Sequence, residues 1–111
     1  MIKILVVDDH ALIRKGLKQL LEDRTDMQVT GEAETGLQAI SMVQKRHYDL
    51  VLLDIALPDK HGVDVLKQLK HDPDTGAIPV IVLTAKGAER DIAASFQFGA
   101  LFHVEKPFET R

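Results

Sequence analysis

Four short apolar runs in this chain are each followed by a polar residue that could take part in chemistry. These residues are Asp8 and Asp9 after the first run, Asp54 after the second, Thr84 after the third and Lys106 after the fourth. If the runs are parallel strands of one sheet, their carboxyl ends meet at one edge, where open α/β folds place ligand sites. Three carboxylates, one hydroxyl and one ammonium group would then share a crevice suited to a metal ion and a phosphoryl group.

The carboxylates of this crevice would repel one another unless a cation lay between them. Two unit charges 4 Å apart repel by roughly 4 kcal/mol at an effective dielectric constant of 20. A divalent cation removes this conflict, and a ligand set of oxygens without His or Cys indicates a hard ion, Mg²⁺ or Mn²⁺. The alternative is that Asp8 and Asp9 cap the helix predicted to begin near Leu12. Capping would explain one of them, but not readily both together with Asp54.

Asp54 could act as a nucleophile, because a carboxylate that attacks phosphorus forms an acyl phosphate. A phosphoryl donor is itself anionic, so the attack needs positive charge, which the metal ion and Lys106 would supply. The hydroxyl of Thr84 could donate a hydrogen bond to a phosphoryl oxygen. Each residue taken alone has an ordinary alternative: a turn after a strand for Asp54, a strand-end hydroxyl for Thr84 and a solvated loop for Lys106.

The elements that must position these residues follow from the hydrophobic pattern. The runs at 2–7, 50–53 and 80–83 are apolar throughout apart from Lys3, which is typical of strands covered on both faces. The run at 101–104 predicts a further strand, and the polar alternation of residues 27–33 predicts an edge strand. Four stretches with helical spacing separate the strands. The first stripe consists of Leu12, Ile13, Leu17, Leu20 and Leu21, and the fourth ends at Gly99, a predicted helix C-cap.

This alternation predicts an α/β fold, a doubly wound five-stranded parallel sheet with helices on both faces. The preferred strand order is the flavodoxin-like 2-1-3-4-5, which brings Asp8 and Asp9 next to Asp54. Residues 1–111 are expected to form a single domain. The chain ends at Arg111, where a fifth helix should begin, so that helix is expected to be missing or truncated.

The composition argues against several classes of function. A net charge of −3 is unfavourable for direct binding of nucleic acid. Without Cys, the chain has neither a disulfide framework nor a thiolate metal site, which fits a cytoplasmic protein. No apolar run approaches the 18 or so residues of a membrane span, and the N-terminus does not have the pattern of a signal peptide.

Over essentially its whole length the chain resembles the receiver domain of a two-component response regulator. The segments that carry the resemblance are Val6-Val7-Asp8-Asp9, the run from Asp54 to Gly62 (Asp-Ile-Ala-Leu-Pro-Asp-Lys-His-Gly), Thr84-Ala85 and Lys106-Pro107-Phe108. The resemblance implies a phosphorylatable signalling switch with Asp54 as phosphoacceptor. The donor would be a sensor histidine kinase, a phosphotransfer protein or a small acyl phosphate. Such a protein assists its own phosphorylation and dephosphorylation but is not an enzyme in the ordinary sense.

The resemblance also implies how the metal ion is held. Asp9 and Asp54 would bind Mg²⁺ directly together with the backbone carbonyl of Ala56, while Asp8 would act through water. The phosphorylated state would be recognised through the surface of helix four and strand five, with homodimer formation on phosphorylation as one outcome.

Further implied roles concern the phosphoryl group and the switch. Thr84 and Lys106 would hold the phosphoryl oxygens, and Thr84 would move together with a switch residue three positions before the lysine. That residue is His103, where the family usually has Tyr or Phe; the alternative is an edge-strand histidine without a switching role. Ala56 and Lys86 would flank the path of an attacking water and tune the lifetime of the phosphoryl group, for which we expect slow self-hydrolysis.

Three other functions are alternatives to a phosphorylatable switch. Phosphatases with a nucleophilic Asp usually carry a second acid two residues later, where this chain has Ala56. Flavodoxin-like flavin or nucleotide domains hold phosphate with a Gly- or hydroxyl-rich backbone after the first strand, where this chain has Asp8-Asp9-His10. A pseudo-receiver that binds other proteins without phosphorylation is the third alternative. The output is undetermined, because residues 7–17 resemble receivers joined to DNA-binding domains, which would imply transcription regulation, whereas residues 71–79 resemble receivers with other outputs or none.

Overall fold

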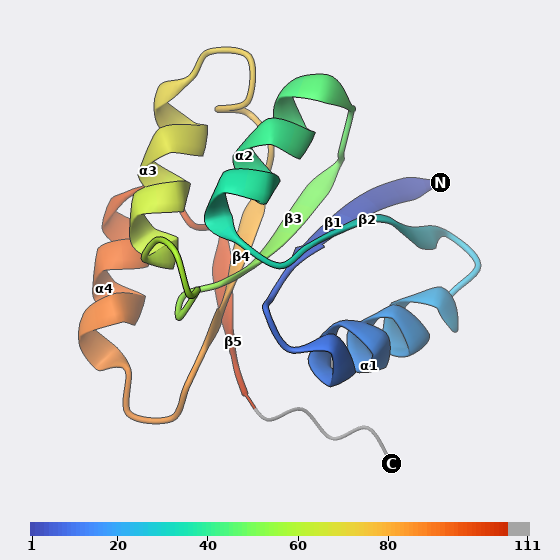
Figure 1. Ribbon diagram of the computed structural model, residues 1–111, viewed down its shortest axis with the longest axis horizontal. Coiled ribbons are helices and arrows are strands. Elements are labelled where there is room, and N and C mark those ends of the chain that lie inside the picture. The colour runs from blue at the N-terminus through green and yellow to red at the C-terminus, as the bar shows by residue number, and fades with distance from the viewer. Residues whose placement is uncertain (107–111) are drawn as a thin grey trace.

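Strands and helices alternate along the chain in the predicted order. The computed structural model describes residues 1–106 (Figure 1). Its elements are β1 (Ile2–Val7), α1 (Ala11–Glu22), β2 (Met27–Ala33), α2 (Gly36–Lys45), β3 (Leu50–Asp54), α3 (Gly62–His71), β4 (Val80–Thr84), α4 (Glu89–Gln97) and β5 (Phe102–Glu105).

The strands form one parallel sheet in the order β2-β1-β3-β4-β5, which confirms the predicted topology. β2 lies at an edge, as its polar alternation predicts, and β5 lies at the other edge. The inner strands carry the continuous apolar runs, and residues 4–7 of β1 are completely buried. Val7 pairs with Leu53 in the register, so the carboxyl ends of β1 and β3 lie side by side.

The two faces of the sheet are covered unequally. Helices α2, α3 and α4 pack on one face, where they enclose the larger hydrophobic cluster, and α1 packs on the other (Figure 1). Because neighbouring side chains of a strand point to opposite faces, each strand contributes alternate residues to the two clusters. In β3, for example, Leu53 belongs to the larger cluster and Leu52 to the cluster under α1.

Two leucines of the predicted α1 stripe do not pack on the sheet, and that part of the prediction is wrong. Leu17 is buried and Ile13 and Leu21 pack beside it, whereas Leu12 is 82% and Leu20 is 44% exposed. Positions 13, 17 and 21 are four apart and share one face of a helix. Residues 12 and 20 each precede a member of this row, and a rotation of about 100° per residue turns them toward solvent.

Gly99 terminates α4 as predicted, but it stands one residue beyond the C-cap, which is Phe98. The helix ends at Gln97, and Gly99 follows with a φ of 102°, a left-handed conformation that glycine adopts without strain. The amide of Ala100 donates to the carbonyl of Ser95 over 2.9 Å, which closes the end of the helix.

Within residues 1–106, no helix follows β5, in agreement with the expected lack of a fifth helix. Of the predicted Lys-Pro-Phe segment only Lys106 is described, and residues 107–111 lie outside the described part of the chain. Among the described helices, none is both long and apolar enough to cross a bilayer.

Candidate functional site

Three aspartates meet at the carboxyl edge of the sheet, and we refer to Asp8, Asp9 and Asp54 as the acidic cup. One ligand atom from each of these residues and one from His10 all lie within 4.8 Å of one another. Asp8 and Asp54 are 0% and 1% exposed, and Asp9 lies at the rim with its side chain 33% exposed. The predicted convergence of the three carboxylates is confirmed.

Lys106 directly follows the edge strand β5, and its side chain extends to the acidic cup. Its backbone amide donates to the carbonyl of Thr84 over 2.6 Å, which fixes the lysine at the end of β5. Its Nζ atom donates to Asp8 Oδ2 over 3.1 Å and lies 3.2 Å from Asp54 Oδ2. Burial alone would lower the pKa of Lys106, but the hydrogen bond to Asp8 and the charges of Asp54 and Asp8 outweigh it and raise the pKa. The ammonium group therefore stays charged.

Asp54 has one carboxylate oxygen engaged and one left without a hydrogen bond. Oδ1 accepts from the amide of Ala56 over 3.1 Å, as in a tight turn after a strand. Oδ2 is buried and has no hydrogen-bond partner among the described residues, although it lies at ion-pair distance from Lys106. Burial and then the charge of Asp8 raise the pKa of Asp54, against the opposing effects of Lys106 and the Ala56 amide. A carboxylate oxygen that contacts a cation and accepts no other hydrogen bond is well placed to react.

His10 is a member of this site that the sequence reasoning missed. Its Nδ1 atom lies 2.8 Å from Asp8 Oδ1 and 3.1 Å from Asp9 Oδ1, and its backbone amide donates to Asp8 Oδ1. The expectation of a cluster without histidine therefore needs correction. The turn after β1 folds residue 10 back over residue 8, and the only sequence signal for this was its place directly after Asp9.

The arrangement of this turn also bears on the capping alternative. The N-cap residue of α1 is His10, and it makes no side-chain cap hydrogen bond. The oxygens of Asp8 are engaged by His10 and Lys106 instead of by amides of the helix. Capping of α1 therefore does not explain why Asp8 is there.

The donor set of the cup fits a divalent cation. The carboxylates outnumber the ammonium group of Lys106 by two charges, and Asp8 and Asp54 are held in a buried environment where like charges repel strongly. Carboxylate oxygens are the ligands that Mg²⁺ and Mn²⁺ prefer. Both oxygens of Asp8 accept hydrogen bonds, whereas Asp54 Oδ2 accepts none among the described residues and Asp9 lies at the rim, so Asp9 and Asp54 are the freer ligands.

The remaining predicted residues lie at the same edge or next to it. Thr84 ends β4, one residue past the Leu83 that pairs with Asp54, and its Oγ1 atom is buried without a hydrogen-bond partner among residues 1–106. Ala56 and Lys86 are exposed on the loops that follow β3 and β4. Within residues 1–106, no hydrogen bond or ion pair joins the Lys86 side chain to the cup.

His103 lies on β5 and is not brought into the acidic cup. Its ring packs edge-on against Phe96 of α4, with ring centroids 5.7 Å apart. The side chain is half-buried, and Nδ1 has no hydrogen-bond partner within residues 1–106. The ring of His103 thus links β5 to α4, and the role of His103 as a switch residue stays a prediction.

The loop that follows Asp54 is tied to α2, which the sequence reasoning did not foresee. The carboxylate of Asp59 accepts from the amides of Gly36 and Leu37 over 2.9 and 3.1 Å. These amides have no acceptor within the helix, because they stand in its first turn. The hydrogen bond from the Gly36 amide is the main reason why the pKa of Asp59 lies below its ordinary value.

The end of the same loop is tied to α3 and α4. His61 caps α3 by accepting the amide of Val63 at Nδ1, and its Nε2 atom lies 3.4 Å from Asp91 of α4. Gly62 packs so closely on the backbone of Ile55 that a Cβ atom would lie 2.5 Å from the Ile55 Cα, so only glycine fits. The loop that follows Asp54 is thus fixed on three helices.

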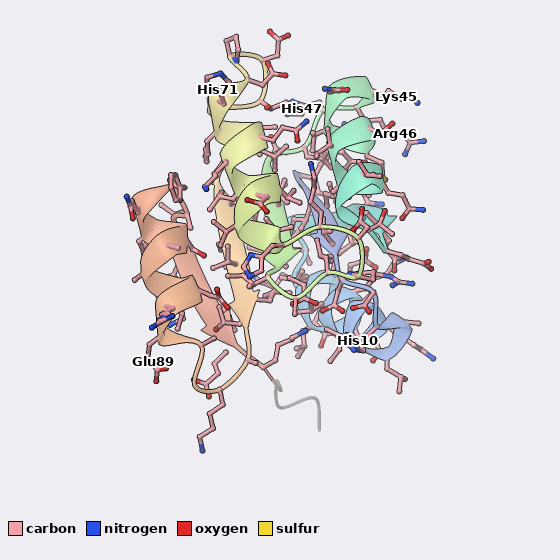
Figure 2. The ribbon with its side chains drawn as sticks, turned by 60° about the vertical axis from the view of Figure 1, so that its left-hand side comes forward. His10, Lys45, Arg46, His47, His71 and Glu89 are labelled. Atoms are coloured by element: carbon pink, nitrogen blue, oxygen red, sulfur yellow. The ribbon has the colours of Figure 1, made fainter. Side chains whose placement is uncertain are left out.

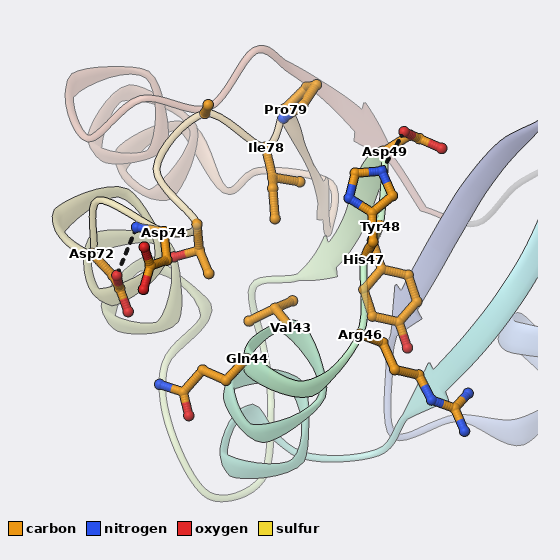
Figure 3. A pocket seen from close by; sticks show the side chains of 12 residues that line it. Val43, Gln44, Arg46, His47, Tyr48, Asp49, Asp72, Asp74, Ile78 and Pro79 are labelled. Atoms are coloured by element: carbon orange, nitrogen blue, oxygen red, sulfur yellow. Dashed lines mark hydrogen bonds and ion pairs between the residues drawn. The ribbon is translucent and has the colours of Figure 1, made fainter.

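A separate groove lies at the opposite end of the molecule. His10 stands at the edge with the acidic cup, whereas Lys45, Arg46, His47 and His71 stand at the other end (Figure 2). The groove, of about 820 Å³, is formed by the C-terminal end of α2 and the loops before β3 and β4 (Figure 3). Its wall includes a hydrogen bond of 2.8 Å between His47 and Asp49, and it contains none of the predicted site residues.

Comparison with known proteins points to one family. The family model described as "Response regulator receiver domain" matches residues 4–111. The protein-glutamate methylesterase/protein-glutamine glutaminase of Pyrococcus abyssi is 40% identical over 106 residues, which are 96% of this chain and 28% of that protein. The transcriptional regulatory protein ResD of Bacillus subtilis is 40% identical over 109 residues, which are 98% of this chain and 43% of that protein. The chain thus spans less than half the length of these relatives.

A solved structure agrees with the sequence relatives. The Mn²⁺-bound form of the response regulator Rcp1 superposes with a TM-score of 0.87 at 30% identity, over 98% of this chain and 84% of that one. The likeness therefore covers the acidic cup as well as the sheet that carries it.

Proposed function

The chain belongs to the family of response regulator receiver domains, and from this premise we propose that Asp54 accepts a phosphoryl group and thereby switches the state of the protein. Receiver domains act in two-component systems with histidine kinases. The proposed donor is accordingly the phosphohistidine of a sensor kinase or a phosphotransfer protein, or a small acyl phosphate. The protein would assist this transfer and the later hydrolysis without being a turnover enzyme.

One observation carries the proposal. The Oδ2 atom of Asp54 is buried, lacks a hydrogen bond among the described residues and lies 3.2 Å from Lys106 Nζ. A buried carboxylate oxygen whose only close partner among the described residues is an ammonium group costs free energy to desolvate, and proteins retain such groups mainly where they function. The neighbouring ammonium group favours the ionised form of this oxygen and would attract an anionic phosphoryl group to it.

The proposed reaction exchanges one bond to phosphorus for another. An oxygen of Asp54 forms a bond to phosphorus while the bond between phosphorus and the donor imidazole nitrogen breaks. The electron pair of the broken bond stays on that nitrogen, and the phosphoryl oxygens are then held by the ammonium group of Lys106 and the hydroxyl of Thr84. The free Oγ1 atom of Thr84 supports this role, because it has no competing partner within residues 1–106.

A bound Mg²⁺ or Mn²⁺ would supply the positive charge that lets an anionic donor approach three carboxylates. Asp9 and Asp54 would hold it together with the backbone carbonyl of Ala56. The protein partners already present on both oxygens of Asp8 support a contact of Asp8 through water.

The switch would run from Thr84 to the surface of α4 and β5. In this proposal, Thr84 moves toward the phosphoryl group and His103 turns into the space that is left. The contact of His103 with Phe96 supports a link to α4. Ala56 and Lys86 would tune the lifetime of the phosphoryl group, and the altered surface would bind an output partner or a second copy of the chain. The relatives carry different outputs, so no output is assigned.

Phosphorylation of the purified chain by acetyl phosphate with Mg²⁺ tests the proposal. Intact mass spectrometry should show the addition of one phosphoryl group to the wild type and none to Asp54→Asn. Asp64→Asn is the matched control, because Asp64 is an exposed carboxylate in the first turn of α3, and it should react like the wild type. An unreactive wild type would favour the pseudo-receiver alternative, and a reactive Asp54→Asn would place the acceptor elsewhere.

A further inference from the structure

Arg14 is an almost buried cation that the proposed reaction does not use. It lies in the first turn of α1, six residues after Asp8, and its side chain is only 11% exposed. Its Nη1 atom donates to the backbone carbonyl of Asp8 over 2.6 Å. The same guanidinium group extends to the end of β2, where Nε donates to Glu32 over 3.1 Å and Nη2 lies 3.4 Å from Glu34. Arg14 thus joins the turn after β1 to α1 and β2.

The carbonyl that Arg14 holds belongs to the peptide bond between Asp8 and Asp9. The amide of Asp8 is fixed by the carbonyl of Ala33 over 3.0 Å, but the backbone of Asp9 makes no hydrogen bond within residues 1–106. The orientation of this peptide plane therefore decides where the Asp9 carboxylate points. Charge-assisted hydrogen bonds from a planar guanidinium group are strong and directional, so Arg14 can fix the plane.

From this geometry we infer that Arg14 is a positioning residue for metal binding, which keeps the carboxylate of Asp9 in the acidic cup by holding the carbonyl of Asp8. The inference rests on the proposed metal site. Glu32 and Glu34 are substantially exposed, so their ion pairs with Arg14 contribute little stability themselves. Their part is to aim the guanidinium group at the carbonyl.

The direction in which Arg14→Ala changes the metal affinity separates a positioning role from a simple electrostatic effect of the charge. Arg14 is a cation close to a cation-binding site, so loss of its charge alone should strengthen metal binding. Loss of a positioning contact should weaken it, and removal of residues that orient metal ligands typically costs about 10- to 100-fold in metal affinity. The two effects predict opposite changes for Arg14→Ala.

The experiment is a titration of the full chain with Mn²⁺, read by the electron paramagnetic resonance signal of free Mn²⁺. Circular dichroism at the same temperature would verify that each variant is folded. We expect Arg14→Ala to bind Mn²⁺ about 10-fold more weakly than the wild type or worse. Lys15→Ala removes the same charge from the next, exposed residue of α1 and should bind as tightly as the wild type or more tightly.

The outcomes distinguish this inference from the proposed function. Unchanged or tighter binding by Arg14→Ala, beside a wild type that binds Mn²⁺, would overturn the positioning role alone. A wild type that binds no Mn²⁺ would overturn the metal site itself. If Arg14→Ala does not fold, Arg14→Lys decides, because it keeps the charge and loses the planar fork: weaker binding would support the role and unchanged binding would refute it.

Discussion

Asp54 combines burial with a reactive role, and these place opposite demands on its carboxylate. Burial and the neighbouring charge of Asp8 favour the protonated form, whereas nucleophilic attack requires the ionised form. Lys106, with Nζ 3.2 Å from the free oxygen, opposes this shift without cancelling it, because the pKa of Asp54 remains above its ordinary value. The arrangement makes the folded state less stable than it would be with a neutral residue, and this cost can be measured.

Asp54→Asn should therefore be more stable than the wild type at pH 7 without metal. The folded-state pKa of Asp54 is raised above its ordinary value of 3.8, so the folded protein binds this proton more tightly than the unfolded chain. Ionised Asp54 consequently lowers stability above the folded pKa and has no such effect below about 3.8. Thermal melts should show a higher Tm for Asp54→Asn at pH 7 and a shrinking difference toward acid pH. A variant less stable than the wild type at pH 7 would contradict the assignment.

Two buried threonines allow function to be separated from stability. Thr84 has no hydrogen-bond partner among residues 1–106, so Thr84→Ala should change the free energy of unfolding little but slow phosphorylation by acetyl phosphate. Thr75 donates to the carbonyl of Leu69 over 2.6 Å, so Thr75→Ala should lower the free energy of unfolding by about 1–3 kcal/mol. This variant should still be phosphorylated. Urea denaturation and reaction rates would be compared for both variants. If Thr84→Ala reacted as fast as the wild type, the Thr84 hydroxyl would have no role in phosphorylation.

The elements at this edge were predictable where periodicity decides them, and not where side chains reach between elements. Continuous apolar runs fixed the strands, and because parallel strands end at one edge, the meeting of Asp8 with Asp54 followed. The fold of the turn that places His10 beside Asp8 depends on backbone angles that no spacing rule gives. The contacts of Arg14 with Asp8 and of Asp59 with Gly36 join residues from separate elements. Composition alone does not reveal such contacts.

Asp59 offers a test of how the loop after β3 is anchored. Its carboxylate holds the first amides of α2, so Asp59→Ala should lower the Tm at pH 7. The pKa of Asp59 is lowered by folding, so this stabilisation is present above its ordinary value of 3.8 and is lost as the pH falls through the folded pKa. The difference between the variant and the wild type should therefore vanish in strong acid. Asp74→Ala, which removes an exposed carboxylate at the far end of the molecule, should show no such pattern.

At the scale of the whole molecule, the sheet gathers charge at one edge and keeps the interior apolar. The acidic cup carries more negative charge than Lys106 offsets, and the strands that carry it contribute side chains to both hydrophobic clusters. A ligand that relieves this repulsion binds the folded chain and not the unfolded one. Its binding should therefore stabilise the whole fold.

Mg²⁺ should accordingly raise the Tm of the wild type. A ligand present at 100 times its dissociation constant adds about 2.7 kcal/mol to the free energy of unfolding. Asp9→Asn removes the ligand at the rim, which is 33% exposed, and should abolish most of the shift without loss of the fold. Calorimetry with and without Mg²⁺, with Ca²⁺ as the comparison ion, measures both. Equal shifts in the wild type and Asp9→Asn would show that Asp9 is not a ligand.

The most direct measurement is a crystal structure of the chain grown with Mg²⁺ and beryllofluoride, a stable mimic of a phosphoryl group on a carboxylate. We expect beryllium bonded to an oxygen of Asp54, with Thr84 Oγ1 and Lys106 Nζ at hydrogen-bond distance from its fluorine atoms and Mg²⁺ held by Asp9 and Asp54. Beryllofluoride attached to another residue, or an Asp54 left unmodified beside an ordered Mg²⁺, would contradict this expectation.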